Sequence, residues 1–193
     1  MRSAHRPRSR ERRPPQPLNP ARLDELALYY VARFATSAAK LETHLKRKLR
    51  ERGWEGDGES PAALEVLVER FVANGYVDDT AFARSRSGSL LRRGYGKRRI
   101  DQALHAAGIA EEVRDEVRAG EGAQRTAALA LARKRRLGPY GPPPADRAAR
   151  EKQIGAMLRA GHPLDSAREL VNAASVEAAE EWAAALDEDE PCD

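Results

Sequence analysis

The sequence has little of what disulfide frameworks and membrane spans require. Its 193 residues include one cysteine, Cys192, so no disulfide can form within the chain. No apolar run approaches the roughly 20 residues that cross a bilayer, and the first residues lack the apolar segment of a signal peptide. These absences argue against secretion and membrane insertion, and we expect a cytoplasmic protein that contacts no membrane.

A large core and a β-sheet are also disfavoured. Only 41% of the residues are hydrophobic and 33% are charged, and the mean hydropathy is −0.69. There is no long alternation of Val, Ile and Thr that would indicate a strand, whereas the helix formers Ala, Arg, Leu and Glu dominate. The composition predicts an all-α fold of amphipathic helices around thin cores.

The residue types of catalytic and metal sites are scarce and scattered. The four histidines are far apart in the sequence, and we expect each at the surface or at a helix end: His5, His44, His105 and His162. No Cys/His cluster has zinc spacing. Residues 94–98 resemble a phosphate loop, but the remainder of that motif is missing. We therefore expect no catalytic residue, no metal, no cofactor and no enzymatic activity.

Charge is unevenly distributed along the chain. The net charge is +4, but residues 1–20 sum to +5 and residues 177–193 to −8, which leaves +7 on the middle. A basic body suits a polyanion or an acidic protein surface as partner. We expect residues 1–18 to form a disordered basic tail, because its prolines oppose the amphipathic helix of an organellar transit peptide, which its arginines otherwise suggest. Residues 175–193 form an acidic C-terminal segment.

The stretch from Gly75 to Ile109 organises the rest of the chain. Asp78 is predicted to cap a helix, and Asp79 then lies in the first turn, where a negative charge meets the positive end of the helix dipole. Val77 and Phe82 have the spacing of a hydrophobic staple. Gly75 is predicted to end the preceding helix with a positive φ. These residues predict a rigid helix–turn–helix joint, and they indicate architecture rather than chemistry.

Similar signals mark other helices. Asn19 is predicted to cap a helix that starts at Pro20, and Asp165 or Ser166 to cap a later one. The third helix should bury a stripe formed by Leu64, Leu67, Val68, Phe71 and Val72.

A pattern of an apolar residue four places before a glycine occurs three times. The pairs are Leu49/Gly53, Leu104/Gly108 and Met157/Gly161, with the glycines 55 and 53 residues apart. Such spacing is typical of stacked helical repeats that share a core. It predicts three tandem three-helix repeats over residues 19–74, 75–120 and 121–174, in an elongated, curved body.

Basic residues recur on the second helix of the first two repeats. Those that we expect to contact a partner protein or DNA phosphate are Lys46, Lys48, Arg92, Arg93, Lys97, Arg98 and Arg99. Exposed Lys and Arg often serve solubility alone. Their recurrence, together with Arg133–Arg136 in the third repeat, favours a basic strip suited to a helical polyanion or filament.

The central motif resembles that of a known family. Gly75-Tyr76-Val77-Asp78-Asp79-Thr80-Ala81-Phe82-Ala83, followed by residues 94–109 with their I-x-x-x-L-x-x-x-G-I ending, is similar to the RecX family of bacterial RecA regulators. Residues 27–34, continued through Leu49 to Trp54, resemble the opening repeat of that family, so the resemblance covers roughly residues 20–175. In the third repeat, His162-Pro163 stands where the family usually has an aromatic residue after the glycine.

The resemblance implies a function without catalysis. Such proteins bind the RecA–DNA filament in its helical groove and suppress ATP hydrolysis, strand exchange and co-protease activity, which regulates DNA repair and the SOS response. We expect a monomer whose main partner is the RecA filament, with weaker electrostatic binding to single- and double-stranded DNA. The alternatives are a stand-alone helical DNA- or RNA-binding protein and a scaffold recruited through the acidic segment.

Overall fold

The computed structural model describes residues 16–185, and in that range the chain forms ten α-helices, one short 3₁₀ helix and no β-strand. The all-α prediction is confirmed. Unit 1 contains α1 (Pro20–Arg33), α2 (Ala38–Arg52) and α3 (Ser60–Ala73). Unit 2 contains α4 (Asp79–Arg92), α5 (Lys97–His105) and α6 (Glu111–Glu116). Unit 3 contains α7 (Glu121–Arg135), the 3₁₀ helix η1 (Gly138–Tyr140), α8 (Arg147–Arg159), α9 (Leu164–Asn172) and α10 (Val176–Ala184).

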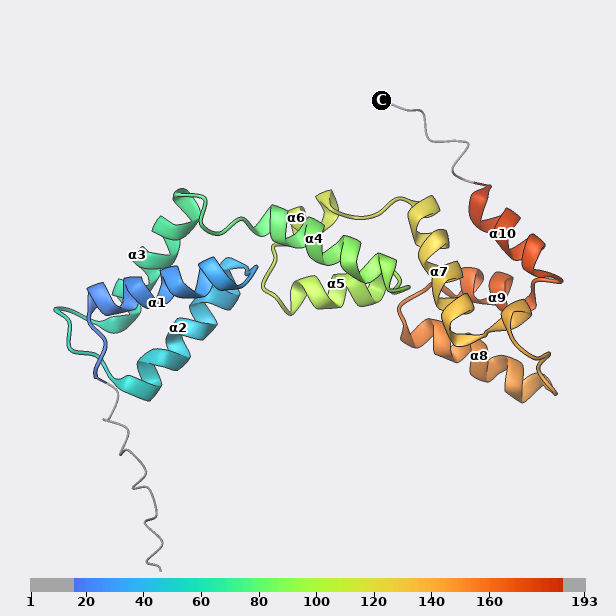
Figure 1. The fold of residues 1–193 in the computed structure, drawn as a ribbon, viewed down its shortest axis with the longest axis horizontal. Helices are drawn as coiled ribbons and strands as arrows, with labels where there is room; N and C mark the ends of the chain where they lie inside the picture. Colours follow the sequence, from blue (N-terminus) through green and yellow to red (C-terminus); the bar gives the residue numbers. More distant parts are fainter. Residues whose placement is uncertain (1–15, 186–193) are drawn as a thin grey trace, which may run out of the picture.

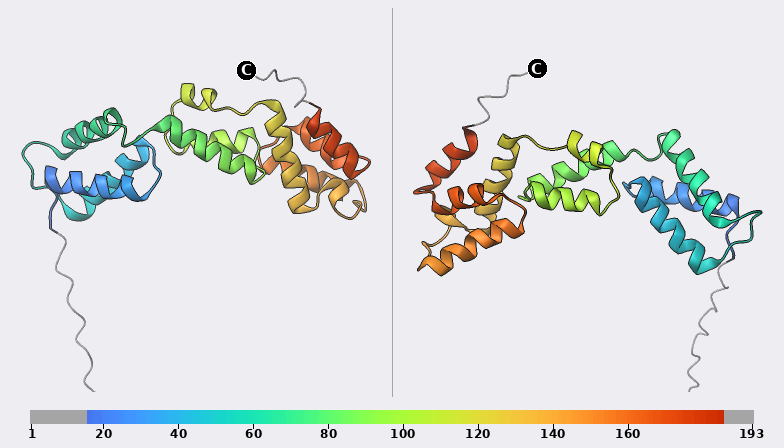
Figure 2. Two further views of the ribbon diagram at one scale, coloured as in Figure 1. Left: turned by 45° about the horizontal axis from the view of Figure 1, so that its top comes forward. Right: turned by 180° about the vertical axis from the view of Figure 1, so that it is seen from behind.

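The three units lie in a row. Figure 1 shows unit 1 at one end, unit 2 in the middle and unit 3 at the other end. The two further views show the same order and a bend at the middle unit (Figure 2). The chain is thus the elongated, curved series of helical repeats that the glycine spacing predicts. In the described range, no helix has the length and apolar character needed to cross a membrane.

Each unit has its own small core. Unit 1 buries Leu18, Leu23, Leu41, Leu45, Leu64, Leu67, Phe71 and Val77 with Ala27. Unit 2 buries Ala83, Leu90, Ile100, Leu104, Ala107 and Ile109. Unit 3 has the largest core, which extends from Ala128 to Ala183. In all three units the second helix is followed by the glycine of the repeat with a positive φ, +79° at Gly53, +73° at Gly108 and +98° at Gly161.

The predicted helix starts at Asn19 and Asp78 are confirmed. The Asn19 side chain accepts from the Arg22 N–H at 3.0 Å, and the Asp78 carboxylate accepts from the Ala81 N–H at 2.8 Å. The predicted cap of α9 is wrong, because Leu164 follows Pro163 at the N-cap with no side-chain hydrogen bond.

Unit 1 starts earlier in the chain than expected. Leu18 is the last residue of the predicted tail of residues 1–18, but it is fully buried in the unit 1 core. Its N–H donates to the Gly53 carbonyl at 2.9 Å and its carbonyl accepts from the Glu55 N–H at 2.8 Å. The chain before α1 is therefore fixed beside the end of α2. Residues 1–15 of the predicted tail lie outside the described residues.

Two apolar residues of unit 1 differ from the prediction. Val72 is 46% exposed and does not belong to the buried stripe of α3. Val77 is buried in the unit 1 core, whereas Phe82 packs against the core of unit 2. The residues predicted to staple one helix start thus serve two different cores, because the joint between α3 and α4 is also the boundary between units.

Unit 3 contains a fourth helix that the three-helix pattern did not predict. Ala179 and Ala183 of α10 are buried in the unit 3 core, and α10 packs against α7. The Arg125 guanidinium lies over the Trp182 ring at 4.8 Å, and Arg133 forms an ion pair with Glu180 at 2.5 Å. The acidic segment is therefore part of the folded body up to Ala185, and residues 186–193 lie outside the described range.

Candidate interaction surface

The strongest candidate surface lies where α4 ends and α5 begins. Leu90 is buried and holds the last turn of α4 on the unit 2 core. Gly94 then adopts a φ of +82°, which reverses the chain, and Gly96 stands at the N-cap of α5. The turn therefore brings the end of one basic helix next to the start of another. We call four of its exposed basic side chains, Arg92, Arg93, Lys97 and Arg99, the α4–α5 basic surface; Arg98 is also exposed, but its guanidinium is hydrogen-bonded to a backbone carbonyl.

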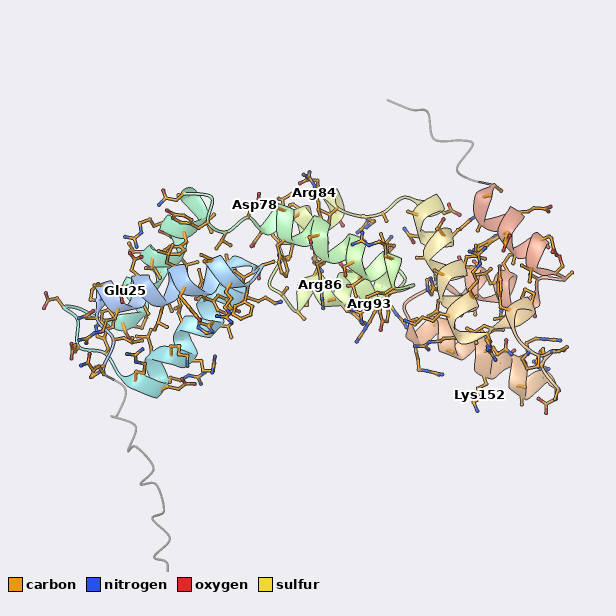
Figure 3. The ribbon with its side chains drawn as sticks, in the orientation of Figure 1. Glu25, Asp78, Arg84, Arg86, Arg93 and Lys152 are labelled. Atoms are coloured by element: carbon orange, nitrogen blue, oxygen red, sulfur yellow. The ribbon has the colours of Figure 1, made fainter. Side chains whose placement is uncertain are left out.

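Within residues 16–185, none of these four side chains has an acidic group within ion-pair distance. Arg93 lies at one edge of the body, the edge on which Lys152 of α8 also projects (Figure 3). Arg84 lies at the opposite edge, where it pairs with Glu116 at 2.6 Å. The cations of the α4–α5 basic surface are thus available to an external anion.

The basic residues of unit 1 have a different environment. Lys46 pairs with Glu42 and Lys48 with Glu51, each at 2.7 Å. The hydrogen bond from Lys48 is the main cause of a lowered pKa at the Glu51 carboxyl. All four side chains are partly or fully exposed, so these pairs contribute little to stability and an external anion can compete for the cations. The predicted residues Lys46 and Lys48 therefore offer less uncompensated charge than those of unit 2.

Arg98 differs from the neighbours with which the sequence grouped it. Its guanidinium Nη2 donates to the Leu158 carbonyl at 2.7 Å, near the end of α8. Its backbone N–H donates to the Gly161 carbonyl at 3.2 Å. Arg98 thus binds carbonyls of unit 3 at the end of a helix, where a cation is favourable. Its position gives it an architectural role in addition to any contact with a partner.

Units 2 and 3 meet through their backbones. The Gly96 N–H donates to the Ala160 carbonyl at 3.0 Å. A Cβ added to Gly96 would lie 2.5 Å from the Gly161 carbonyl carbon, and one added to Gly161 would lie 2.4 Å from the Arg99 nitrogen. Side chains at these positions would prevent the close approach. Tyr95 packs against the cores of both units, so the α4–α5 basic surface is fixed relative to unit 3.

His162 completes this junction; it lies just after the end of α8, in agreement with the prediction of a surface or helix-end position, but it is buried. It is only 4% exposed, and its Nε2 lies 3.0 Å from the Gly94 carbonyl oxygen. Because a carbonyl can only accept, Nε2 carries the proton and donates. Burial lowers the pKa of His162 from its ordinary value, although the bond to Gly94 opposes that effect. The only sequence signal for this role was the unusual residue after the glycine of the third repeat.

Units 1 and 2 meet through side chains at helix ends. The Ser37 hydroxyl donates to the Ala107 carbonyl at 2.6 Å and accepts from the Lys40 N–H at 3.3 Å. The Asp79 carboxylate accepts from the Ala38 N–H at 2.9 Å. Asp79 was predicted to act on the dipole of its own helix, but it also caps α2 of the preceding unit. Sequence reasoning did not find this cap, because its partner is 41 residues away.

Two further residues of the central motif lie at this boundary. Tyr76 is 55% exposed, and its ring packs against Phe71 with the ring centroids 5.3 Å apart. A Cβ added to Gly108 would lie 2.2 Å from the Ala39 Cβ. Gly108 thus combines the positive φ expected of a helix end with a close approach to α2. Among the described residues, no group of three or more potential metal ligands comes together.

Comparison with known proteins identifies the family. A profile described as RecX, second three-helix domain, matches residues 78–117. The regulatory protein RecX of Myxococcus xanthus is 33% identical over 174 residues, which cover 86% of this chain and 93% of that protein. The chain belongs to the RecX family. The RecX regulatory protein of Agrobacterium fabrum is also 33% identical, over 72% of this chain and 76% of its own length.

Solved RecX structures share the fold. The crystal structure of RecX from Lactobacillus salivarius has a TM-score of 0.61 at 16% identity, over 79% of this chain and 94% of that one. A second crystal structure, of a regulatory protein RecX, has a TM-score of 0.60 at 20% identity, over 79% and 70% of the two chains. The profile match covers all of unit 2 from Asp78 to Val117, including the α4–α5 basic surface.

Proposed function

We propose that this protein is a cytoplasmic, monomeric and non-catalytic regulator of the RecA recombinase that binds the RecA–DNA filament and inhibits its activities. Its membership of the RecX family, whose curated relatives are named regulatory proteins, supports the role. The RecA partner, the suppression of ATP hydrolysis, strand exchange and co-protease activity, and the link to DNA repair and the SOS response come from the family resemblance.

The main structural support for the proposal is the uncompensated charge of the α4–α5 basic surface, whose residues we infer to contact the filament. Four cations on one rigid turn attract the phosphates of DNA or an acidic face of a protein filament. The elongated body supports binding along a groove, because three units in a row can contact several filament subunits (Figure 1). Lys46 and Lys48 would add contacts by exchanging Glu42 and Glu51 for groups of the filament. Arg98 would add a contact from the junction of units 2 and 3.

The test is RecA-dependent ATP hydrolysis on single-stranded DNA, titrated with the protein at fixed salt. We expect wild-type protein to inhibit, and a triple variant with Arg92, Arg93 and Lys97 changed to Ala to need at least about tenfold more protein, as several lost phosphate contacts would require. Inhibition well below one protein per RecA subunit would indicate action on filament growth. Inhibition only near saturation would indicate coating of the groove.

The matched control removes three charges that already have partners. Arg70, Arg84 and Arg118 pair with Asp24, Glu116 and Asp115 respectively. The triple alanine variant of these arginines has the same net charge as the test variant, and we expect it to inhibit nearly as well as wild type. An equal loss of inhibition in both variants would mean that inhibition depends on net charge and not on the α4–α5 basic surface. Absence of inhibition by wild-type protein, with DNA binding retained, would favour a nucleic-acid-binding protein that acts without RecA.

A further inference from the structure

Aromatic residues are rare in this chain, yet three of them gather at the end of α1. The sequence contains only ten Phe, Trp and Tyr residues. Tyr29, Tyr30 and Phe34 lie within six positions of one another. Tyr29 is 61% and Phe34 51% exposed. Of the three, only Tyr30 packs against the unit 1 core, so Tyr29 and Phe34 leave half or more of their surface open to solvent.

Two of these rings, Tyr30 and Phe34, are in contact with each other, and Tyr30 also stacks on a histidine of α2. The Tyr30 ring lies 4.1 Å from the His44 ring at an interplanar angle of 21°, which is a stacked arrangement. On its other side, Tyr30 meets Phe34 at 5.3 Å and 47°. Burial, followed by the nearby charges of Arg47 and Lys48, lowers the pKa of His44 from its ordinary value. The exposed Tyr29 ring occupies the neighbouring position of α1, and we call Tyr29, Tyr30, Phe34 and His44 the α1 aromatic cluster.

Two guanidinium groups border the cluster. Arg33 lies 5.8 Å over the Tyr29 ring and donates to the Tyr29 hydroxyl at 2.8 Å. Arg47 has its Nη2 at 3.4 Å from His44 Nδ1, and it pairs with Glu51 at 3.0 Å. Within residues 16–185, Arg33 has no acidic partner at ion-pair distance. The cluster thus combines exposed ring faces with an uncompensated cation.

This combination matches the chemistry of an unpaired nucleotide. A base presents a π face that stacks on an aromatic ring, and its phosphate attracts a guanidinium. In a duplex the bases are stacked on each other, so only the phosphates are available to such a cluster. An apolar protein surface would cover the rings but would leave Arg33 without a counter-charge. Ring exposure and charge together therefore favour a single-stranded nucleic acid as the occupant.

We propose that the α1 aromatic cluster is a stacking site for unpaired bases of single-stranded nucleic acid, with Tyr29 and Phe34 as the contacting rings and Arg33 as a phosphate ligand. The site is in unit 1, away from the α4–α5 basic surface, and its action does not require RecA. It gives the protein a way to distinguish single strands from duplexes, which phosphate contacts alone do not provide.

The experiment measures binding of the full-length protein to three fluorescein-labelled probes by anisotropy at fixed salt and without RecA. The probes are an oligothymidylate, an abasic oligonucleotide of the same length and a duplex. We expect the double variant Tyr29→Ala/Phe34→Ala to bind oligothymidylate about tenfold more weakly, a loss typical of one stacked base. We expect unchanged binding to the abasic strand and to the duplex. Equal wild-type affinity for oligothymidylate and the abasic strand would overturn the proposal.

Two further variants separate stacking from other causes. Tyr29→Leu/Phe34→Leu keeps the apolar character but removes the ring faces, so it should lose the same affinity as the alanine variant. Full retention of oligothymidylate binding by the leucine variant would exclude stacking. Tyr76→Ala removes another exposed tyrosine, at the boundary of units 1 and 2, and should leave binding unchanged. A matching loss in that control would also count against the site.

Two additional readouts complete the test. Photocrosslinking of an oligonucleotide containing 5-iododeoxyuridine, followed by mass spectrometry, should place the crosslink at Tyr29 or Phe34. A crosslink only at Lys and Arg-rich segments elsewhere would overturn the assignment. If the alanine variant binds oligothymidylate normally but loses inhibition of the RecA ATPase, the cluster is a protein contact and the proposal is wrong, while the RecA function stands.

Discussion

The two junctions of this chain are built from different chemistry. Units 2 and 3 meet through backbone hydrogen bonds and glycines, and Tyr95 packs on both cores. Units 1 and 2 meet through Ser37 and Asp79, whose side chains cap helix ends across the boundary. Both junctions exclude an added Cβ, at Gly96 and Gly161 in the first and at Gly108 against Ala39 in the second. They differ in their hydrogen bonds, because among the described residues only the first has backbone-to-backbone bonds between units, whereas the bonds of the second come from the Ser37 and Asp79 side chains.

The largest effect should come from a methyl group at the junction of units 2 and 3. Gly96→Ala would place its Cβ 2.5 Å from the Gly161 backbone, which has no flexible side chain to move aside. We expect a loss of about 3 kcal/mol in the free energy of unfolding, as for overpacked cores. Urea unfolding followed by circular dichroism measures it.

The control for that variant lies in the middle of α8. A Cβ at Gly155 would meet only the flexible end of Arg159 at 3.2 Å. Gly155→Ala should therefore stabilise the helix by about 0.5–1 kcal/mol. If Gly96→Ala were as well tolerated as Gly155→Ala, the backbone junction would not have the close approach described above.

A smaller effect should follow from removing the side chains at the junction of units 1 and 2. Ser37→Ala removes the cap of α2 and the bond to the Ala107 carbonyl, and we expect a loss of about 2 kcal/mol. Asp79→Ala removes one cap and should cost about 1 kcal/mol. Amide hydrogen exchange of Ala38 should accelerate in the Asp79 variant.

Asp78 provides the neighbouring control. Its carboxylate caps α4 through the Ala81 N–H and makes no contact across the boundary that would protect Ala38. Asp78→Ala should cost a similar amount, but it should accelerate exchange at Ala81 and leave Ala38 protected. Slow amide exchange at Ala38 in the Asp79 variant would contradict the role of the Asp79 carboxylate in linking units 1 and 2.

The smallest effect concerns pH and the buried histidine. The pKa of His162 is lower in the fold than its ordinary value of 6.5. As the pH falls below that value, His162 therefore binds a proton more readily in the unfolded chain than in the folded chain. Stability from this group is present above that value and is lost as pH falls through it, by less than about 1.4 kcal/mol per pH unit. The melting temperature, measured at a series of pH values from above 6.5 to below it, should depend less on pH in His162→Gln than in wild type.

His44 also has a lowered pKa, and it adds a pH dependence of the same sign in unit 1. The variant His44→Gln therefore serves as a comparison for His162→Gln, and the double variant should have the least dependence. An unchanged slope in His162→Gln would mean that the bond to Gly94 offsets the cost of burial.

Much of the fold was predictable because its signals are local. The caps at Asn19 and Asp78, the helical periodicity and the three repeat glycines all act within a few residues of one another. α10 was missed as a member of unit 3, because its small buried residues, Ala179 and Ala183, give a weak apolar pattern. Leu18 was assigned to the tail because its partners at Gly53 and Glu55 are distant in sequence.

The candidate site was predictable in its residue types but less so in its environment. Sequence shows that Lys48 and Lys97 are both basic, but only the fold shows that Lys48 pairs with Glu51. Likewise, the local sequence around Arg98 does not indicate that its guanidinium reaches Leu158 in the next unit. Which charges are compensated depends on tertiary contacts, and sequence periodicity does not report them.

The cap that Asp79 supplies to α2 has a consequence for the newly synthesised chain. Ala38 emerges from the ribosome 41 residues before its hydrogen-bond acceptor, and Ser37 emerges 70 residues before its partner carbonyl. At typical rates of translation these gaps last about 2–8 s and 4–14 s respectively. Throughout that interval unit 1 must persist with the start of its second helix incompletely bonded. Completion of the first repeat is thus timed by the arrival of the second.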